Sequence, residues 1–403
     1  MTTTEQSYAI TPQLGDKLKR YQNTSAFVGL VFLALLVAGY FLVSPQQFLR
    51  SYLVGFWFWF GMSAGCLLLL MTQYLTGGAW GMMIRRPLEA GSKTIFVMFW
   101  GFLPLLLGVH TLYWWSTPAG LADKVIQSKH LYLNLPFLWV RWVIYGLVWM
   151  TLTYLLNKWS RLEEETKSTD YSKKLETLSA PGVILYFLTM TFCAVDYIMT
   201  LEPHWYSTVY GFMIVIGQAL SAMAFMVAIL VVVAKYPPMD HAVTKKHLHD
   251  LGKLLLALVM LWAYLNFAQL LITWSANLPD EVVWYIKRWN GGWGWIALSL
   301  LLLHFCLPFL LLLSQSLKKN PRTIFGIAVF LICIRVVDVF SLVEPNFADV
   351  KNVHFSMSWL DVVAPLGFGG LWLALFFRNL PQQNLMPLGA PDLKKVLSHG
   401  REH

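Results

Sequence analysis

Acidic side chains inside apolar stretches are the residues of this chain best suited to chemistry. Asp196 and Asp338 each stand six residues before a Glu-Pro pair, and the acids of those pairs are Glu202 and Glu344. The two copies are separated by 142 residues, from 196 to 338 and from 202 to 344. A carboxylate within a hydrophobic span is costly, so it is commonly paired or used to move protons. We therefore expect the duplicated acids to mark functional positions.

Two further polar side chains are predicted to lie at the depth of Asp196. Counting from the outer ends of the predicted spans at 1.5 Å per residue, His110, Arg141 and Asp196 all lie on the order of 10 Å below the outer surface. An imidazole and a desolvated carboxylate can accept protons from a quinol, and a guanidinium can donate hydrogen bonds to a quinone. We predict a quinol or proton site here; a structural ion pair with a hydrogen-bonded histidine is the alternative.

The second half of the chain has a related but different set. Arg335 precedes Asp338 by three residues on one helical face, where an ion pair is expected. His304 is predicted near the centre of its span, and Gln269 takes the place of His110. These groups either have a structural role or carry protons. The predicted proton route consists of His110, Asp196, Glu202, His304 and Asp338, with Arg335 and Glu344 beside it.

The elements that must position these residues are membrane-spanning helices. The chain has 403 residues, of which 57% are hydrophobic and 13% charged, whereas soluble domains carry about 25% charged residues. Its apolar runs approach the roughly 20 residues needed to cross a bilayer. We predict an all-α polytopic membrane protein. Its ten helices are expected at about 26–43, 52–76, 93–115, 134–157, 181–201, 207–234, 252–274, 293–316, 323–343 and 358–378.

The helices are predicted to form two parallel four-helix-bundle repeats, helices 2–5 and 6–9, with helices 1 and 10 peripheral. Gly55-Phe56-x4-Gly61 matches Gly211-Phe212-x4-Gly217, and Trp115-Ser116 matches Trp274-Ser275. Because each repeat has an even number of helices, the copies share one orientation about an axis along the membrane normal. The expected units are 1–25 (N-terminal segment), 26–51 (helix 1 and outer loop), 52–206 (first repeat), 207–350 (second repeat) and 351–403 (helix 10 and tail).

The distribution of basic residues predicts the topology. The net charge is +9, but the basic residues fall in short loops, so nucleic-acid binding is not indicated. Most lie in the even-numbered loops and the two ends, and the segment Arg161–Lys174, charged in both signs, is expected to be a solvated cytoplasmic linker. The odd-numbered loops hold only Arg50, Lys124, Lys129, Lys287, Arg288 and Lys351. Positive charge concentrates on the cytoplasmic side, so both termini are predicted to be cytoplasmic and the Glu-Pro corners to face outward.

No metal or haem ligand set is recognisable. The four cysteines fall inside apolar spans and form no Cys-x-x-Cys or Cys-x-x-Cys-His motif, which argues against iron–sulfur, c-type haem and structural zinc. The intramembrane histidines, His110 and His304, are predicted at different depths and do not form haem-binding pairs. We expect this chain to bind no redox cofactor of its own.

The chain resembles the membrane subunits of the NrfD/polysulfide-reductase type, which interact with quinones. The stretches Trp262–Gln269 and Trp274–Glu281 are similar to helix 7 of the large membrane subunits of bacterial alternative complex III. The stretch Leu303–Phe309 and the two Glu-Pro corners are similar to the same subunits. The length resembles that of the shorter, ActF-type, second quinone-binding subunit.

This resemblance implies a subunit of a quinol:cytochrome c oxidoreductase in the bacterial inner membrane. Quinol oxidation near the outer face and proton translocation would be its expected activities, with menaquinol or ubiquinol as substrate, and the chain is not expected to be active alone. The implied partners are a larger paralogous quinone-binding subunit, an iron–sulfur subunit, multihaem c-type cytochromes and lipid, but no nucleic acid. A secondary transporter and a purely structural anchor are the alternatives.

Overall fold

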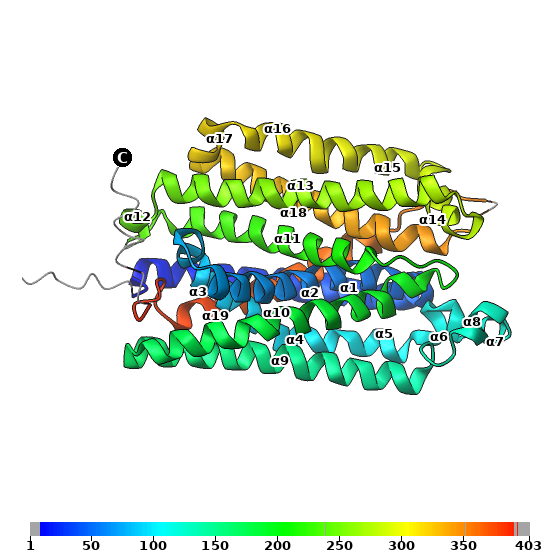
Figure 1. The fold of residues 1–403 in the computed structure, drawn as a ribbon, viewed down its shortest axis with the longest axis horizontal. Coiled ribbons are helices and arrows are strands. Elements are labelled where there is room, and N and C mark those ends of the chain that lie inside the picture. Colours follow the sequence, from blue (N-terminus) through cyan, green and yellow to red (C-terminus); the bar gives the residue numbers. More distant parts are fainter. Residues whose placement is uncertain (1–8, 238, 351, 391–392, 394–403) are drawn as a thin grey trace, which may run out of the picture.

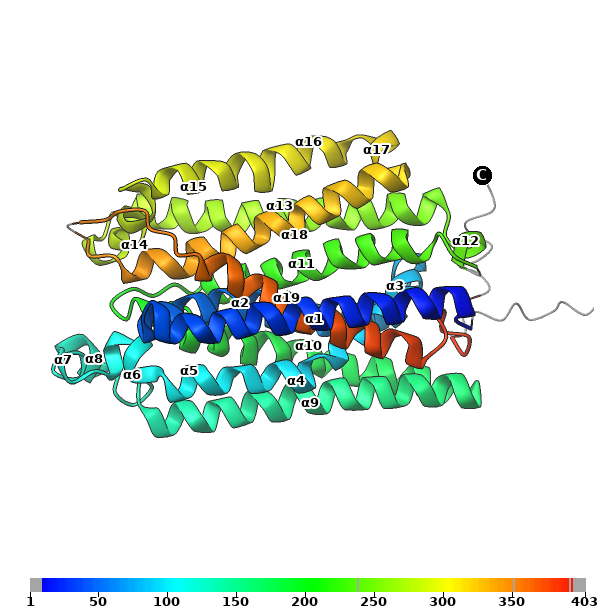
Figure 2. The same ribbon diagram turned by 180° about the vertical axis from the view of Figure 1, so that it is seen from behind.

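The protein is an all-α bundle of long apolar helices. The computed structural model describes residues 9–237, 239–350, 352–390 and 393, and these ranges contain no β-strand. Within them, ten helical segments are long and apolar enough to cross a membrane, which confirms the predicted fold class. Figures 1 and 2 show these segments running side by side along the long axis of the molecule.

The long segments alternate with short helices at the ends of the bundle. The uninterrupted long helices are α1 (Pro12–Leu42), α2 (Pro45–Thr76), α9 (Leu135–Thr166), α10 (Thr169–Tyr197), α11 (Tyr210–Val233), α13 (Lys245–Ala276), α18 (Pro321–Val343) and α19 (Leu360–Asn379). The short ones are α6 (Val109–Leu112), η2 (Trp114–Ser116), α7 (Pro118–Leu121), α8 (Lys124–Ser128), η3 (Met199–Leu201), α12 (Met239–Ala242), α14 (Pro279–Trp289), α17 (Gln315–Lys319), η5 (Glu344–Phe347) and η6 (Leu380–Gln382).

Two of the ten segments change helix type in mid-length, whereas three others do so only at their ends. The third consists of α3 (Ala79–Lys93), α4 (Ile95–Met98), the 3₁₀-helix η1 (Phe99–Phe102) and α5 (Leu103–Leu107). The eighth consists of α15 (Trp293–Ser299), the π-helix η4 (Leu300–Cys306) and α16 (Leu307–Leu313). A proline follows each irregular stretch, Pro104 and Pro308, and a proline removes the N–H that a regular helix would donate four residues back.

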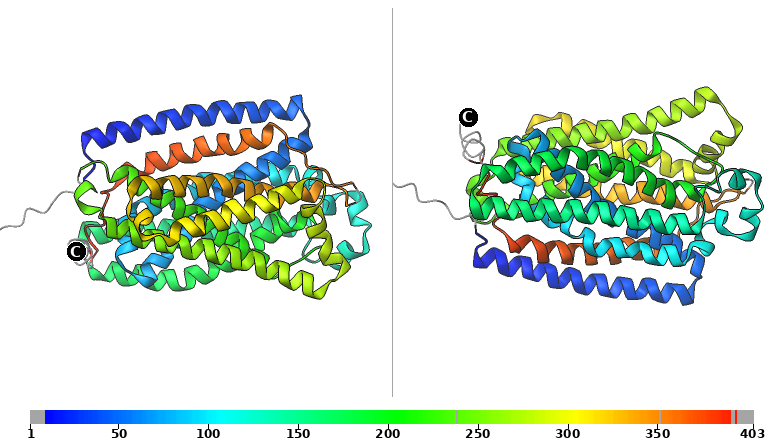
Figure 3. Two further views of the ribbon diagram at one scale, coloured as in Figure 1. Left: turned by 90° about the horizontal axis from the view of Figure 1, so that it is seen from above. Right: turned by 60° about the horizontal axis from the view of Figure 1, so that its bottom comes forward.

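The two central helices, α2 and α11, are buried along most of their length. They approach closely because small residues face the crossing: a Cβ on Gly65 would lie 2.3 Å from the carbonyl oxygen of Gln218. Small residues serve this purpose in membrane bundles, where close packing replaces the hydrophobic effect between helices. Helices α1 and α19 lie together on one side of the bundle, as predicted for peripheral helices (Figure 3).

The segment predicted to be a solvated linker is helical. Helix α9 continues to Thr166 and α10 begins at Thr169, so only Lys167 and Ser168 separate them. Lys167 ends α9 in the left-handed conformation, with φ of 52°. The prediction was wrong because charged residues were taken to end the helices, whereas several of them form buried ion pairs described below.

Both described ends of the chain lie at one end of the bundle, hereafter the terminal end, and α6–α8 and α14 lie at the other, hereafter the α14 end (Figures 1 and 2). The first helix of each proposed repeat, α2 or α11, is central and contacts the second and fourth helices of its own repeat. Helix α2 contacts α3 and α10, and helix α11 contacts α13 and α18. The duplication itself stays a prediction. Lys351 and the tail from residue 394, which the predicted units include, lie outside the described residues.

Candidate functional site

Arg141 and Asp196 form a buried ion pair in the first half of the chain. Asp196 Oδ2 accepts hydrogen bonds from Arg141 Nε at 2.9 Å and from the Tyr145 hydroxyl at 2.7 Å. Arg141 also donates to the Tyr132 carbonyl at 3.0 Å and lies over the Tyr132 ring, 3.9 Å from its centroid. Asp196 Oδ1 is buried with no hydrogen-bond partner among the described residues. Two of the three residues predicted to cluster are therefore in contact.

His110 is not part of this pair. It lies in α6 and is exposed, and its Nδ1 is 3.0 Å from the carbonyl oxygen of Ser116. The span that was expected to continue to residue 115 ends at Leu107, and α6 is a separate short helix at the α14 end. His110 therefore lies outside the span that was expected to bury it, and its imidazole contacts backbone instead of Asp196.

The second half of the chain contains an aromatic cavity at the α14 end. Its volume is about 480 Å³, and its walls come from α13, α14, the α15–α16 segment and α18. Rings of Trp262, Trp284, Tyr285 and Trp293 line it together with aliphatic side chains. A mostly apolar cavity between helices with a few polar groups is the usual form of a small-molecule site.

Asp338 is the carboxylate in the cavity wall. As the three-residue spacing predicts, Arg335 pairs with it on the same helix. Trp262 Nε1 donates to the same oxygen, Oδ2, at 3.1 Å. In the described part of the chain both of these bonds fall on Oδ2, so Oδ1 keeps its capacity to accept a hydrogen bond or a proton. Asp338 is thus held in place through one carboxylate oxygen, Oδ2.

A glycine makes room for the guanidinium that pairs with Asp338. A Cβ on Gly217 of α11 would lie 2.3 Å from Arg335 Nη2. Arg335 Nε also donates to Ser221 Oγ at 3.4 Å, one helical turn further along α11. The second-half charge pair is therefore positioned by α11 as well as by its own helix.

His304 lies in the π-helix η4, next to the cavity wall. It is fully buried, and neither ring nitrogen has a hydrogen-bond partner among the described residues. Its ring centroid is 3.9 Å from that of Trp262, whose indole bonds Asp338. Such π-turns occur often at functional sites because they change the direction of side chains. The expected position of His304, inside its span, agrees with the structure.

Helix α14 covers the cavity and joins the two Glu-Pro corners. Lys287 pairs with Glu202 of the first corner and donates to the carbonyl of Asn346 in the second at 3.3 Å. Trp284 stacks on Trp205, with centroids 4.9 Å apart. The predicted proton-route residue Glu202 is therefore half of an ion pair that connects the halves of the chain.

Arg288 attaches α14 to the end of α18. It donates to the carbonyls of Ser341 at 3.2 Å and Leu342 at 3.0 Å, and to Asn346 Oδ1 at 3.1 Å. The last carbonyls of a helix lack helical partners and carry the negative end of its dipole, so a cation is favourable there. Burial lowers the pKa of Arg288 to about 10, which leaves the guanidinium charged at neutral pH.

Glu344 lies apart from the cavity, beside α2. Its side chain is buried, and Oε1 has no hydrogen-bond partner among the described residues. The guanidinium of Arg50 lies over the Phe347 ring, 4.0 Å from its centroid. Nearby Asp361 accepts from Ser51 Oγ at 2.5 Å. Among the described residues, Glu344 thus resembles Asp196, because each has one buried carboxylate oxygen without a hydrogen-bond partner and neither lines the cavity.

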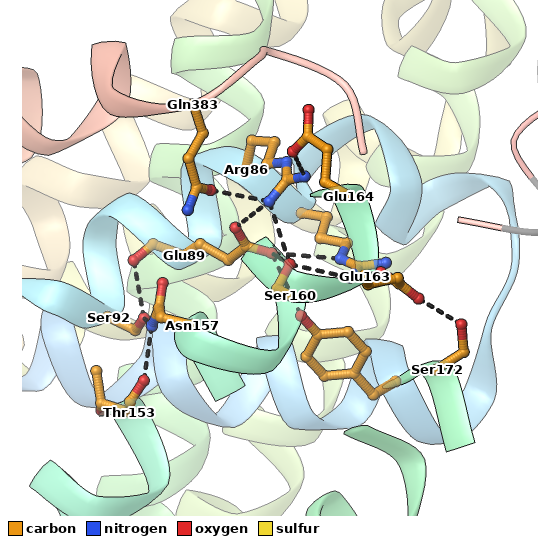
Figure 4. Close-up of polar contacts among 12 residues, drawn as sticks. Arg86, Glu89, Ser92, Thr153, Asn157, Ser160, Glu163, Glu164, Ser172 and Gln383 are labelled. Carbon is orange, nitrogen blue, oxygen red and sulfur yellow. Dashed lines mark hydrogen bonds and ion pairs between the residues drawn. The ribbon is translucent and has the colours of Figure 1, made fainter. Parts of the chain in front are cut away.

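Sequence reasoning missed a buried charge network at the terminal end (Figure 4). Arg85 of α3 pairs with Glu89 at 3.3 Å and with Glu163 of α9. Arg86 pairs with Glu89 at 2.7 Å and with Glu164. The i, i+3 and i, i+4 spacing of Arg85, Arg86 and Glu89 was the available signal, but it was interpreted as loop charge.

The described residues contain no group of three or more His, Cys, Asp or Glu side chains that could hold a metal ion. No model of a known protein family matches the sequence, and no curated protein matches it. Function is therefore inferred from the fold and from the geometry of the cavity.

Proposed function

We propose that this chain is an integral membrane subunit of a quinol:cytochrome c oxidoreductase of the alternative complex III type, and that it binds quinol in the second-half cavity. The observation that supports the proposal is Asp338 in the wall of an aromatic cavity of about 480 Å³ between membrane helices. Flat aromatic walls suit a quinone ring, and a fixed carboxylate suits a hydroxyl that must lose its proton.

In this proposal the head group lies between the indole rings, with one hydroxyl at Asp338 Oδ1. Oxidation of a quinol releases two protons and two electrons. Asp338 accepts the first proton, while Arg335 and Trp262 hold its other oxygen. His304, whose ring centroid lies 3.9 Å from that of Trp262, is the neighbouring base that receives this proton, so that Asp338 can then accept the second. The electrons leave to iron–sulfur clusters and c-type haems in partner subunits.

The proposal includes a membrane location for the chain and a set of partner subunits. In the bacterial inner membrane with both termini cytoplasmic, the α14 end and its cavity face outward, where multihaem cytochromes can accept electrons. A larger paralogous quinone-binding subunit and an iron–sulfur subunit complete the complex. The proposed site differs from the site at His110, Arg141 and Asp196 that was expected from the sequence. The cavity is lined by Asp338, whereas the guanidinium of the Arg141–Asp196 pair is enclosed by aromatic rings.

Quinone titration of the purified chain tests the proposal. The chain is placed in quinone-free lipid nanodiscs and titrated with a short-chain ubiquinone and a short-chain menaquinone, with quenching of tryptophan fluorescence as the readout. Ala297 lines the cavity, and Ala297→Trp fills it and should weaken binding at least tenfold. Ala34→Trp is the matched control, because Ala34 is exposed on α1.

Equal quinone affinity in the two tryptophan variants would overturn the proposed site. Solute uptake by the chain alone in proteoliposomes would favour the transporter alternative. Normal turnover of the intact complex carrying Ala297→Trp would favour a structural anchor.

A further inference from the structure

A second cavity lies at the terminal end, far from the proposed quinol site. Its volume is about 370 Å³, and its walls come from the α3–α4 junction, from α9, and from Asn379 and Gln383 at the end of α19 and just after η6. Three basic side chains line it: Lys93, Lys158 and Arg161. No acidic side chain is among the described residues in its wall. Three cationic side chains and no acidic one among the described wall residues suit an anionic ligand.

The carboxylates closest in sequence to these cations are already engaged elsewhere. Glu89, Glu163 and Glu164 pair with Arg85 and Arg86 in the neighbouring network (Figure 4). Among the described residues, no carboxylate lies within ion-pair distance of Lys93 or Lys158.

Arg161 does have an acidic neighbour. Its Nε is 3.5 Å from Glu165 Oε1, but both side chains are exposed, and exposed pairs of this kind contribute little. The three cations are thus available to a ligand.

Amide side chains supply directional contacts in the same cavity. Gln383 accepts from Arg86 through Oε1 at 2.8 Å, which turns its NH₂ group toward other acceptors. Asn157 is 8% exposed, and its Oδ1 has no partner among the described residues. Its Nδ2 is held by the Thr153 carbonyl and Ser92 Oγ. A buried acceptor without a partner in a cationic cavity suits a ligand that also carries hydroxyl groups.

An apolar path continues from the cavity toward the middle of the bundle. Phe96 and Tyr154 belong to its wall, and Tyr154 is 54% exposed. Further along α4, η1 and α9, the exposed side chains are Val97, Trp100 and Leu147. Helices α4 and α9 run side by side along the lateral surface of the bundle (Figure 2). Cations at the end of membrane helices with an exposed apolar strip beyond them match a lipid with an anionic head group.

We propose that this cavity binds the head group of an anionic phospholipid, with its phosphodiester among Lys93, Lys158 and Arg161. The glycerol and any head-group hydroxyls bond Asn157 and Gln383, and the acyl chains lie along Val97, Trp100 and Leu147. The site is independent of quinol binding.

Native mass spectrometry of the full chain in a neutral detergent tests this proposal. The probes are phosphatidylglycerol, phosphatidylcholine and inorganic phosphate, each titrated separately. The chain should retain phosphatidylglycerol at least tenfold more tightly than phosphatidylcholine. Lys93→Gln/Lys158→Gln should weaken phosphatidylglycerol binding about 30-fold, from about 1 kcal/mol per basic residue near an anionic head group. Lys173→Gln/Lys174→Gln, on exposed lysines of α10 at the same end, should leave it unchanged.

Two results would overturn the proposal. The first is equal phosphatidylglycerol binding in both double variants; the second is inorganic phosphate binding with the same dependence on Lys93 and Lys158, which would indicate a free-phosphate site. If the first double variant does not fold, Arg161→Gln replaces it, since Arg161 is exposed. The increase in thermal unfolding temperature on adding phosphatidylglycerol should then fall relative to the unaltered chain, and an unchanged increase would reject the site.

Discussion

Arg141 donates from Nε to Asp196 Oδ2 at 2.9 Å, across two helices and with both side chains almost fully buried. The guanidinium is enclosed by the rings of Tyr132 and Phe137, and Tyr145 bonds the same carboxylate oxygen. This pair joins α9 to α10 inside the apolar part of the bundle. Its counterpart in the second half, Arg335–Asp338, lies within one helix and borders a cavity. The two pairs therefore have different expected consequences when broken.

Breaking the Arg141–Asp196 pair should mainly destabilise the protein. Arg141→Leu leaves a buried carboxylate without its cation and should cost about 3–5 kcal/mol of unfolding free energy. Arg141→Leu/Asp196→Leu removes both charges and should recover most of that loss. Denaturant titration in detergent, followed by circular dichroism, measures both values. A double variant that is no more stable than the single one would contradict this account.

Breaking the Asp338 contact should mainly affect turnover. Asp338→Asn removes the proposed proton acceptor, so quinol:acceptor turnover of the intact complex should fall about 100-fold, within the range for loss of a general base. Asp361→Asn is the control, because Asp361 is also a buried carboxylate at the α14 end but does not line the cavity. Turnover assays on assembled complexes provide the comparison, and equal effects of the two substitutions would reject the role of Asp338.

Gly217 should be intolerant of even one methyl group. The Cβ of Gly217→Ala would lie 2.3 Å from Arg335 Nη2, so the guanidinium must move away from Asp338, at a cost of about 1–3 kcal/mol. Gly326→Ala in α18 is the matched control: it is exposed, and a Cβ there meets no atom within 4 Å. That change should stabilise the helix by up to about 1 kcal/mol. Thermal unfolding of both variants tests this prediction, because the unfolding temperature should fall for Gly217→Ala and rise for Gly326→Ala.

Lys287→Met should loosen α14. Lys287 connects Glu202 to the second Glu-Pro corner, and its loss leaves Glu202 without its cation, at a cost of about 3 kcal/mol. Hydrogen–deuterium exchange should then increase in residues 279–289 and at both corners. Lys124→Met, on an exposed lysine at the same end of the bundle, should change nothing there. Unchanged exchange in the Lys287 variant would show that Arg288 alone fixes the helix.

The number of spans could be predicted from sequence because long apolar runs are unambiguous. The ends of the helices could not. Arg85 and Glu163 were taken as loop charges, but each is neutralised by a partner that is distant in sequence, so helices α3 and α9 continue through them. An ion pair between two helices leaves no local signature in a single sequence.

The site was only partly predictable for a related reason. Helical spacing on one face was enough to pair Arg335 with Asp338. His110 was misplaced because its depth was counted along one continuous helix, whereas the span ends at Leu107. The cavity depends on α14, whose charged, amphipathic sequence gave no indication that it would cover a pocket. Its buried Lys287 and Arg288 find their partners only in the folded bundle.

The π-helix at Leu300–Cys306 should allow the eighth segment to lose one residue without disrupting its packing. A π-turn accommodates one residue more than an α-turn. Loss of one residue there would restore an ordinary helix and keep the flanking residues on their present sides, although His304 itself would rotate. The same loss in the middle of α11 would rotate every subsequent side chain by about 100°. Natural variation in segment length is therefore expected to concentrate beside His304, at the place where chemistry is proposed.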